Sequence, residues 1–156
     1  MILYFLRHGK ADWPDWSGPD DERPLTEEGV ADMRIVAAAL KRLKVAPDSL
    51  LSSPLPRALR TAQIAADELD VSVEICSELE PGFGRREFDA LIAPRAGADV
   101  MLVGHEPDFS SLIRALTGAR VKLGKAAVAA VEVSDDAPAG RLLWLFPAKM
   151  LIRLYR

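Results

Sequence analysis

The chain has 156 residues, of which 49% are hydrophobic and 28% charged, and its formal net charge is −3. This length suits one domain over residues 1–156, and a chain of this size can fold without a disulfide or a structural metal. The composition excludes a disordered or collagen-like protein. The mild acidity argues against a protein that coats nucleic acid, because such a protein needs a basic face. We therefore expect a globular domain without a nucleic-acid partner.

The sequence predicts a cytoplasmic location. Its single cysteine, Cys76, cannot form an internal disulfide, which fits a reducing compartment. The apolar opening over residues 1–6 ends at Arg7 and has no basic segment before it, so it is interpreted as a strand and not as a signal peptide. No apolar stretch approaches the roughly 18 residues of a membrane span. We expect a protein that is neither exported nor inserted in a membrane.

The first half of the chain predicts two strand-helix units. Residues 2–6 are apolar without alternation, which indicates a central strand buried on both faces. Thr26 can cap a helix, whose apolar face repeats at three- and four-residue steps through Val30, Met33, Val36, Leu40 and Leu43. Residues 49–52 predict a second strand. Residues 56–69 predict a second helix, with Leu59, Ala62, Ala65 and Leu69 turned inward.

The second half continues this alternation. Residues 73–75 are a weaker strand candidate, and residues 99–103 are another buried strand before a helix at 107–116 that Gly118 can end. Residues 128–133 and 142–146 complete the strands, and residues 12–24 and 134–140 are expected to be loops. The predicted fold class is α/β, a three-layer sandwich whose mostly parallel central sheet is flanked by helices on both faces. Such sheets bind ligands at the carboxyl ends of their strands.

Both histidines of the chain directly follow predicted buried strands. His8 comes after the first strand and His105 after the strand at 99–103. Because the carboxyl ends of parallel strands lie at one edge of a sheet, the two imidazoles are expected to meet there. A pair of hydrogen-bonded packing histidines is the simpler alternative. The strand-end position favours a functional site.

Two arginines are predicted to join the histidines. Arg57 lies in the opening turn of the helix at 56–69, where a cation is mildly unfavourable, so its presence suggests a nearby anion. Arg7 ends the first strand. Guanidinium groups match phosphate oxygens in pairs and keep their charge. The expected guest of this basic pocket is a phosphoryl group.

These segments resemble the histidine phosphatase superfamily, also called the phosphoglycerate mutase-like family. The resemblance is carried by Leu-Arg-His-Gly from residue 6, by Ser-Ser-Pro-x-x-Arg-Ala-x-x-Thr-Ala from residue 52, and by Gly-His-Glu from residue 104. Arg-Pro-Leu-Thr-Glu-Glu-Gly from residue 23 adds a further landmark. The short chain, without a large insertion after the second helix, looks most like the SixA-type phosphohistidine phosphatase branch.

The resemblance implies a role for each matching residue. His8 would attack phosphorus and become transiently phosphorylated, as suits an imidazole that titrates near neutrality. Arg7 and Arg57 would clamp the phosphoryl oxygens, and His105 would donate to them in the transition state. Arg23 is a further substrate-binding candidate, since its loop could fold over the pocket or point to solvent. Arg60, one turn beyond Arg57, is expected to be a surface charge.

The proton donor is the open position in this scheme. Many members of the family use a carboxylate in the segment that corresponds to residues 77–82, where Glu80 is preferred over Glu78. A solvated loop residue is the simpler interpretation of either. A phosphohistidine needs less protonation of its leaving group than a phosphate ester does. Glu106, beside His105, could instead orient an imidazole.

Other phosphate chemistries fit the sequence poorly. A cysteine phosphatase needs an arginine six residues after its thiolate, where Cys76 is followed by Gly82. Residues 118–125 only faintly resemble a P-loop, because their glycine spacing is wrong and Ala126 stands where the hydroxyl residue belongs. Two histidines without a ligand cluster make a zinc site improbable. The sequence therefore predicts a metal-independent reaction without a cofactor.

Three functions remain open from the sequence. The first is a phosphatase that acts on phosphohistidine in a partner protein, since a small chain without a cap domain should leave an open, shallow pocket. The second is a phosphatase of small phosphate esters. The third is a phosphate-binding module without catalysis, against which the presence of both histidines and both arginines argues. Trp13 and Trp16 flank the site in a loop, where packing is the simpler role and substrate contact the alternative.

Overall fold

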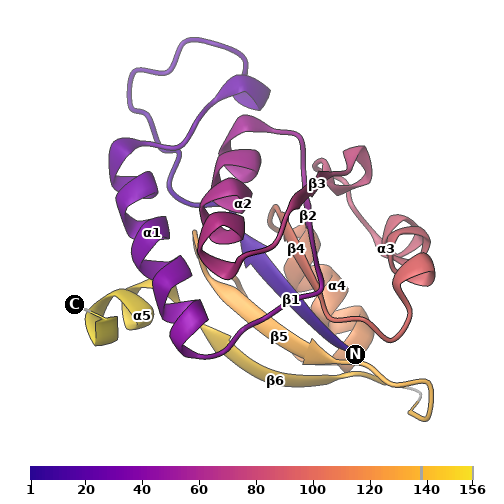
Figure 1. Ribbon diagram of the computed structural model, residues 1–156. Coiled ribbons are helices and arrows are strands. Elements are labelled where there is room, and N and C mark those ends of the chain that lie inside the picture. Colours follow the sequence, from indigo (N-terminus) through magenta and orange to yellow (C-terminus); the bar gives the residue numbers. More distant parts are fainter. Residues whose placement is uncertain (138, 156) are drawn as a thin grey trace.

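The fold is a six-stranded sheet between two layers of helices, as the sequence predicts (Figure 1). The computed structural model describes residues 1–137 and 139–155. Its strands are β1 (Ile2–Arg7), β2 (Ser49–Ser52), β3 (Val73–Ile75), β4 (Val100–Gly104), β5 (Val128–Glu132) and β6 (Arg141–Phe146). Its α-helices are α1 (Glu27–Arg42), α2 (Pro56–Leu69), α3 (Arg85–Ile92), α4 (Asp108–Thr117) and α5 (Ala148–Tyr155). No helix within the described ranges is long and apolar enough to cross a membrane.

The sheet is mostly parallel. Its strand order is β3-β2-β4-β1-β5-β6, with parallel pairing from β3 to β1 and antiparallel pairing of β5 and β6 at the other side. The central strand β1 carries no polar alternation because helices cover both faces of the sheet. The parallel order places the carboxyl ends of β1, β2 and β4 at one edge.

Each face of the sheet has its own apolar core. Tyr4 and Leu6 of β1 point into the core under α1, α2 and α5. Leu3 and Phe5 point into the core under α3 and α4. Alternate residues of a strand therefore serve opposite layers, as the pleat requires. The two layers are visible on either side of the sheet in Figure 1.

Most predicted elements are confirmed, and their signals are seen in the structure. The Thr26 hydroxyl accepts the Gly29 N–H at 3.0 Å and caps α1, while Gly118 ends α4 in the left-handed conformation at φ 78°. The predicted inward position of Leu43 is wrong: this residue follows the last turn of α1 and is exposed. Leu59 and Leu69 are half-buried instead of fully inward.

Two helices were not expected from the sequence. Helix α3 buries only Phe88 and Leu91, and α5 buries only Leu151. Each has eight residues, which gives about two turns of periodicity and too little repetition to reveal a helix. Contact with the rest of the fold, more than their own pattern, stabilises such short helices.

Candidate active site

The register of β1 and β4 brings the two histidines together. Arg7 lies opposite Gly104, so His8 and His105 leave neighbouring parallel strands at the same level. The His8 N–H donates to the Gly104 carbonyl at 3.1 Å, which continues the ladder by one residue. The ring centroids lie 5.4 Å apart, with an interplanar angle of 54°. The predicted meeting of the two imidazoles at one sheet edge is therefore what the structure shows.

The proton position on His8 follows from its neighbour. Its Nδ1 lies 2.8 Å from the Gly9 carbonyl oxygen. Because a carbonyl only accepts, Nδ1 must donate, and Nε2 is left with the lone pair. Burial lowers the pKa of His8 to about 3, and the charges of His105, Arg57 and Arg7 act in the same direction. At neutral pH His8 is thus an uncharged imidazole with a free Nε2.

His105 is also neutral and nearly buried. Burial, together with the charges of Arg57 and Arg7, lowers its pKa to about 4. Its Nε2 lies 2.8 Å from the Ser53 hydroxyl, and its backbone carbonyl accepts the Phe109 N–H at the start of α4. Its ring is thereby held at the end of β2, and its backbone at the start of α4.

Arg57 enters the site from the first turn of α2, where only 5% of the residue is exposed. Its Nη1 donates to the Asp20 carbonyl at 2.8 Å, and its Nη2 lies 3.4 Å from the Asp20 carboxylate. No role for Asp20 is predicted from the sequence. One of three consecutive acidic residues, it carries no local signal that separates it from Asp21 and Glu22.

Arg7 approaches from the end of β1. Its Nη1 donates to the Leu123 carbonyl at 2.9 Å. The charges of Arg7 and Arg57 both lower the pKa of each imidazole, so all four groups lie within electrostatic range of one another. The four residues that the sequence predicts as one site thus converge at this edge of the sheet.

Three nitrogens of this group lack a protein partner. Among the described residues, the buried side-chain nitrogen and oxygen atoms without a hydrogen bond are Arg7 Nε, Arg57 Nε and His105 Nδ1. An unpartnered buried donor is costly, by about 1–3 kcal/mol. Their concentration in three of the four site residues marks a place prepared to contact an anion.

Two further contacts join the loop of His8 to the helices around it. The Thr61 hydroxyl accepts the Gly9 N–H at 3.0 Å and donates to the Arg57 carbonyl at 2.7 Å, so α2 and the strand end are held together. Gly29 lets α1 approach closely, because a Cβ there would lie 2.2 Å from the Lys10 carbonyl oxygen. The segment after β1 is therefore fixed by both helices.

Arg23 is folded back into the loop of residues 12–24. Its guanidinium donates to the Asp20 carboxylate at 3.0 and 3.2 Å and to the Ala11 carbonyl, and it lies 3.9 Å from the Asp12 carboxylate. Of the two orientations considered for Arg23, the structure has the folded one. Asp20 lies between Arg23 and Arg57, so this loop covers part of the site.

Neither Glu80 nor Glu106 has a hydrogen bond or ion pair with a histidine in the described ranges. Glu80 is exposed at the end of the short 3-10 helix Ser77–Leu79, and no side-chain hydrogen bond or ion pair of Glu80 is found in the described ranges. Glu106 accepts the Ser110 N–H at 2.7 Å and the Leu123 N–H at 3.4 Å. It therefore orders the start of α4 and the segment that holds Arg7, and the expectation that Glu106 orients an imidazole is wrong.

Both histidines are buried, where the sequence predicts an open, shallow pocket. Only 6% of His8 and 4% of His105 is exposed. The segment around Asp20 lies against Arg57. An open hollow of about 610 Å³ adjoins it, lined by Asp12, Trp13, Pro14, Trp16 and Arg23. The indole N–H groups of both tryptophans donate to backbone carbonyls, so their rings are held while remaining partly exposed.

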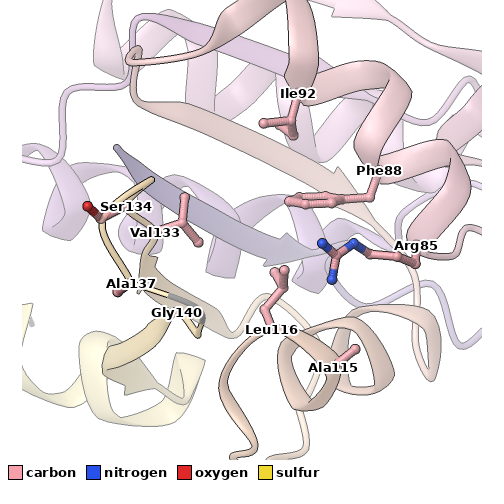
Figure 2. A pocket seen from close by; sticks show the side chains of 9 residues that line it. All are labelled: Arg85, Phe88, Ile92, Ala115, Leu116, Val133, Ser134, Ala137 and Gly140. Atoms are coloured by element: carbon pink, nitrogen blue, oxygen red, sulfur yellow. The ribbon is translucent and has the colours of Figure 1, made fainter.

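A separate hollow lies between α3, α4 and the end of β5, away from the histidines. Figure 2 shows Phe88, Ile92 and Leu116 around it, with Arg85 at one side. The Arg85 guanidinium is paired with Asp89 at 2.8 Å. None of the predicted site residues lines this space of about 200 Å³.

Comparison with known proteins identifies the family. The sequence profile of the histidine phosphatase superfamily (branch 1) matches residues 3–88, which include His8 and Arg57. The chain belongs to this superfamily. His105 lies beyond the matched segment, yet the fold places it beside His8.

Several relatives resemble this superfamily member over most of its length. An uncharacterized protein of Picosynechococcus is 37% identical over 82% of each chain. The phosphohistidine phosphatase SixA of Escherichia coli is 32% identical over 74% of each chain. The structure of a protein histidine phosphatase SixA complexed with tungstate superposes with a TM-score of 0.83 at 28% identity, covering 97% of this chain and 99% of that one. The superfamily member is therefore SixA-like in sequence and fold.

The two neutral imidazoles should make stability depend on pH. In the unfolded chain they protonate near pH 6.5, whereas in the folded protein their pKa values are about 3 and 4. The unfolded state then binds more protons in this window, so the free energy of unfolding should fall as the pH drops below 6.5. Urea unfolding at pH 7 and pH 5.5 measures this loss. Between these two pH values, the free energy of unfolding should fall less in the double variant His8→Gln, His105→Gln than in the unaltered protein. An equal fall in both proteins would contradict the prediction.

Proposed function

We propose that this protein is a phosphatase that removes the phosphoryl group from a phosphohistidine in a partner protein through a phospho-His8 intermediate. The observation that carries the proposal is the buried, neutral His8, whose Nε2 is free beside His105, Arg7 and Arg57. A lone pair on nitrogen at neutral pH is what a nucleophilic imidazole needs.

The proposed reaction has two transfers. In the first, His8 Nε2 bonds to phosphorus while the bond from phosphorus to the substrate imidazole breaks, and that imidazole takes up a proton. In the second, water attacks the phosphorus of phospho-His8, which releases inorganic phosphate and returns the imidazole. Arg7 and Arg57 hold the phosphoryl oxygens, and His105 donates to them as charge develops. Metal and cofactor are not part of this scheme.

The remaining candidates have smaller roles. Arg23 acts on the phosphoryl group through the Asp20 carboxylate that it shares with Arg57. Glu80 is a weaker candidate for the proton donor, since its side chain is exposed and has no hydrogen bond or ion pair with the site residues in the described ranges. A phosphohistidine suits a site whose candidate carboxylate is exposed to solvent, because its leaving imidazole needs little help from an acid.

The substrate class is supported by similarity to the SixA phosphohistidine phosphatase of Escherichia coli and by the surroundings of the site. The hollow beside it is exposed and bordered by Trp13 and Trp16. Partly exposed aromatic rings with fixed orientation are typical contact groups for a protein surface. A cytoplasmic location is part of the proposal, and the single cysteine, which fits a reducing compartment, supports it.

A comparison of substrates tests the proposal. We expect kcat/KM to be at least tenfold higher on a phosphohistidine-bearing protein than on any member of a panel of phosphorylated metabolites, a difference of about 1.4 kcal/mol in transition-state binding. Equal or faster turnover of a metabolite would favour the small-ester phosphatase instead. Phosphate binding without turnover of any substrate would favour a silent binding module.

A further inference from the structure

Ser53 lies directly behind His105, at the end of β2. Its N–H donates to the Val103 carbonyl at 3.0 Å, so Ser53 extends the β2–β4 ladder next to the strand that carries His105. The residue is fully buried, and its hydroxyl oxygen lies 2.8 Å from His105 Nε2. This hydroxyl is the neighbour that decides where the His105 proton is.

The direction of this hydrogen bond follows from counting donors and acceptors. The Ser53 oxygen also accepts the Leu55 N–H at 3.3 Å. If His105 Nε2 donated to Ser53, the hydroxyl proton of Ser53 would have no acceptor within the described part of the chain. If Ser53 donates to Nε2 instead, the hydroxyl has a partner both as donor and as acceptor. Nε2 then has the lone pair, and the single proton of the neutral ring is on Nδ1.

His105 Nδ1 is the nitrogen that lacks a protein partner. Its N–H is therefore available to an oxygen of the bound phosphoryl group. Both imidazoles have their proton on Nδ1, but they present different ring nitrogens to the substrate. The Gly9 carbonyl accepts the Nδ1 proton of His8, which leaves a lone pair for attack, whereas the Ser53 hydroxyl occupies the lone pair of His105, which leaves a proton to donate.

We propose that Ser53 is a positioning residue that fixes His105 as the Nδ1-protonated tautomer and aims this N–H at the phosphoryl oxygens. The aim of this N–H at the phosphoryl oxygens rests on the proposed phosphatase function, whereas the tautomer does not. Ser53 acts through His105 and does not contact the substrate. Its role resembles that of groups that orient a ligand or base by holding its far nitrogen.

The chain offers a matched control at the preceding residue. Ser52 is also fully buried, but its hydroxyl donates to the Ser53 carbonyl at 2.9 Å and does not contact His105. Ser52→Ala and Ser53→Ala remove the same atom from neighbouring positions. If the tautomer of His105 differs between the two variants, the cause is the hydrogen bond from Ser53 and not the loss of a buried hydroxyl.

Nitrogen NMR of the histidine rings tests the tautomer in the resting protein. The chain has two histidines, so in His8→Gln the histidine signals come from His105. We expect its Nδ1 to be protonated and Nε2 to have the lone pair, and we expect the same in Ser52→Ala. Ser53→Ala should give a mixture of tautomers. A proton on Nε2 with Ser53 intact, or identical spectra for the two alanine variants, would overturn the proposal.

Kinetics with the His8 nucleophile intact provide the second measurement. We expect Ser53→Ala to lower kcat roughly 10- to 100-fold with little change in KM, less than the 10²–10³ that loss of such a donor costs. Ser52→Ala should retain kcat, and Ser53→Thr, which keeps a hydroxyl, should restore most of it if the extra methyl group is accommodated. An unchanged kcat in folded Ser53→Ala overturns the positioning role. If the unaltered protein hydrolyses none of the phosphorylated substrates, the proposed function is wrong. The NMR spectra then still decide whether Ser53 sets the tautomer of His105.

Discussion

Replacing His8 with alanine is expected to abolish both turnover and phosphoryl labelling of the protein. The variant lacks the Nε2 atom that the proposed mechanism bonds to phosphorus, so kcat should fall by at least about a thousandfold. The fold should persist, because the change removes one hydrogen bond, from His8 to the Gly9 carbonyl, at a cost of about 1 kcal/mol. Brief exposure to a labelled phosphoryl donor, followed by rapid denaturation, locates the modified residue.

The controls for this experiment separate loss of chemistry from loss of structure. Thermal unfolding of His8→Ala should remain cooperative, and inorganic phosphate should still bind, since Arg7, Arg57 and His105 are retained. Label that appears on another residue of the unaltered protein would contradict His8 as nucleophile. Wild-type turnover in His8→Ala would do the same.

Replacing Arg57 with alanine is the second change with a large expected effect. The guanidinium is buried and its Nε lacks a protein partner, so it is available to an anion. Removing a charge-assisted contact costs about 1.5–3 kcal/mol, which corresponds to roughly a 10- to 150-fold loss of phosphate affinity. The rate should fall as well, because the phosphoryl group gains charge-assisted contacts in the transition state. Inhibition by phosphate and steady-state kinetics measure the two losses.

Helix α2 supplies a matched control for Arg57. Arg60 lies one turn further along and is exposed, as the sequence predicts. Arg60→Ala changes the net charge by the same amount as Arg57→Ala but leaves the site intact. Arg57→Lys keeps the charge and loses the paired donors, so it should be intermediate. Equal kinetics for the two alanine variants would remove Arg57 from the site.

The contact between Asp20 and Arg57 places the loop of residues 12–24 against the candidate site. The Asp20 carbonyl and carboxylate contact the two Nη atoms of Arg57, which are the paired donors that a phosphoryl group would use. A bound phosphoryl group must therefore share Arg57 with this segment or shift it. The 70% exposure of the Asp20 side chain shows that solvent already weakens the charge part of this contact.

The elements that the sequence predicted well have strong local signals. The apolar run of β1 and the caps of α1 and α4 depend on neighbouring residues, so they can be seen without knowledge of the fold. Helices α3 and α5 were missed because each has two turns and at most two buried residues. The antiparallel pairing of β5 and β6 within a parallel sheet has no local signature either.

The sequence alone singles out the four candidate site residues that the structure brings together. His8 and His105 follow buried strands, and parallel strands end at the same edge of a sheet, so their meeting could be inferred from position. Arg57 was found because a cation at the start of a helix is unfavourable without an anion nearby. These inferences need only the order of elements along the chain.

Only the tertiary structure decided which neighbours these residues have. Asp20 and Arg57 are 37 residues apart, and Ser53 and His105 are 52 residues apart. Whether a hydroxyl or a carbonyl faces an imidazole depends on shifts of an ångström in the packing of loops, which no local pattern records. For that reason the sequence predicts a basic pocket, while the burial of its two histidines and their lowered pKa values come from the folded chain.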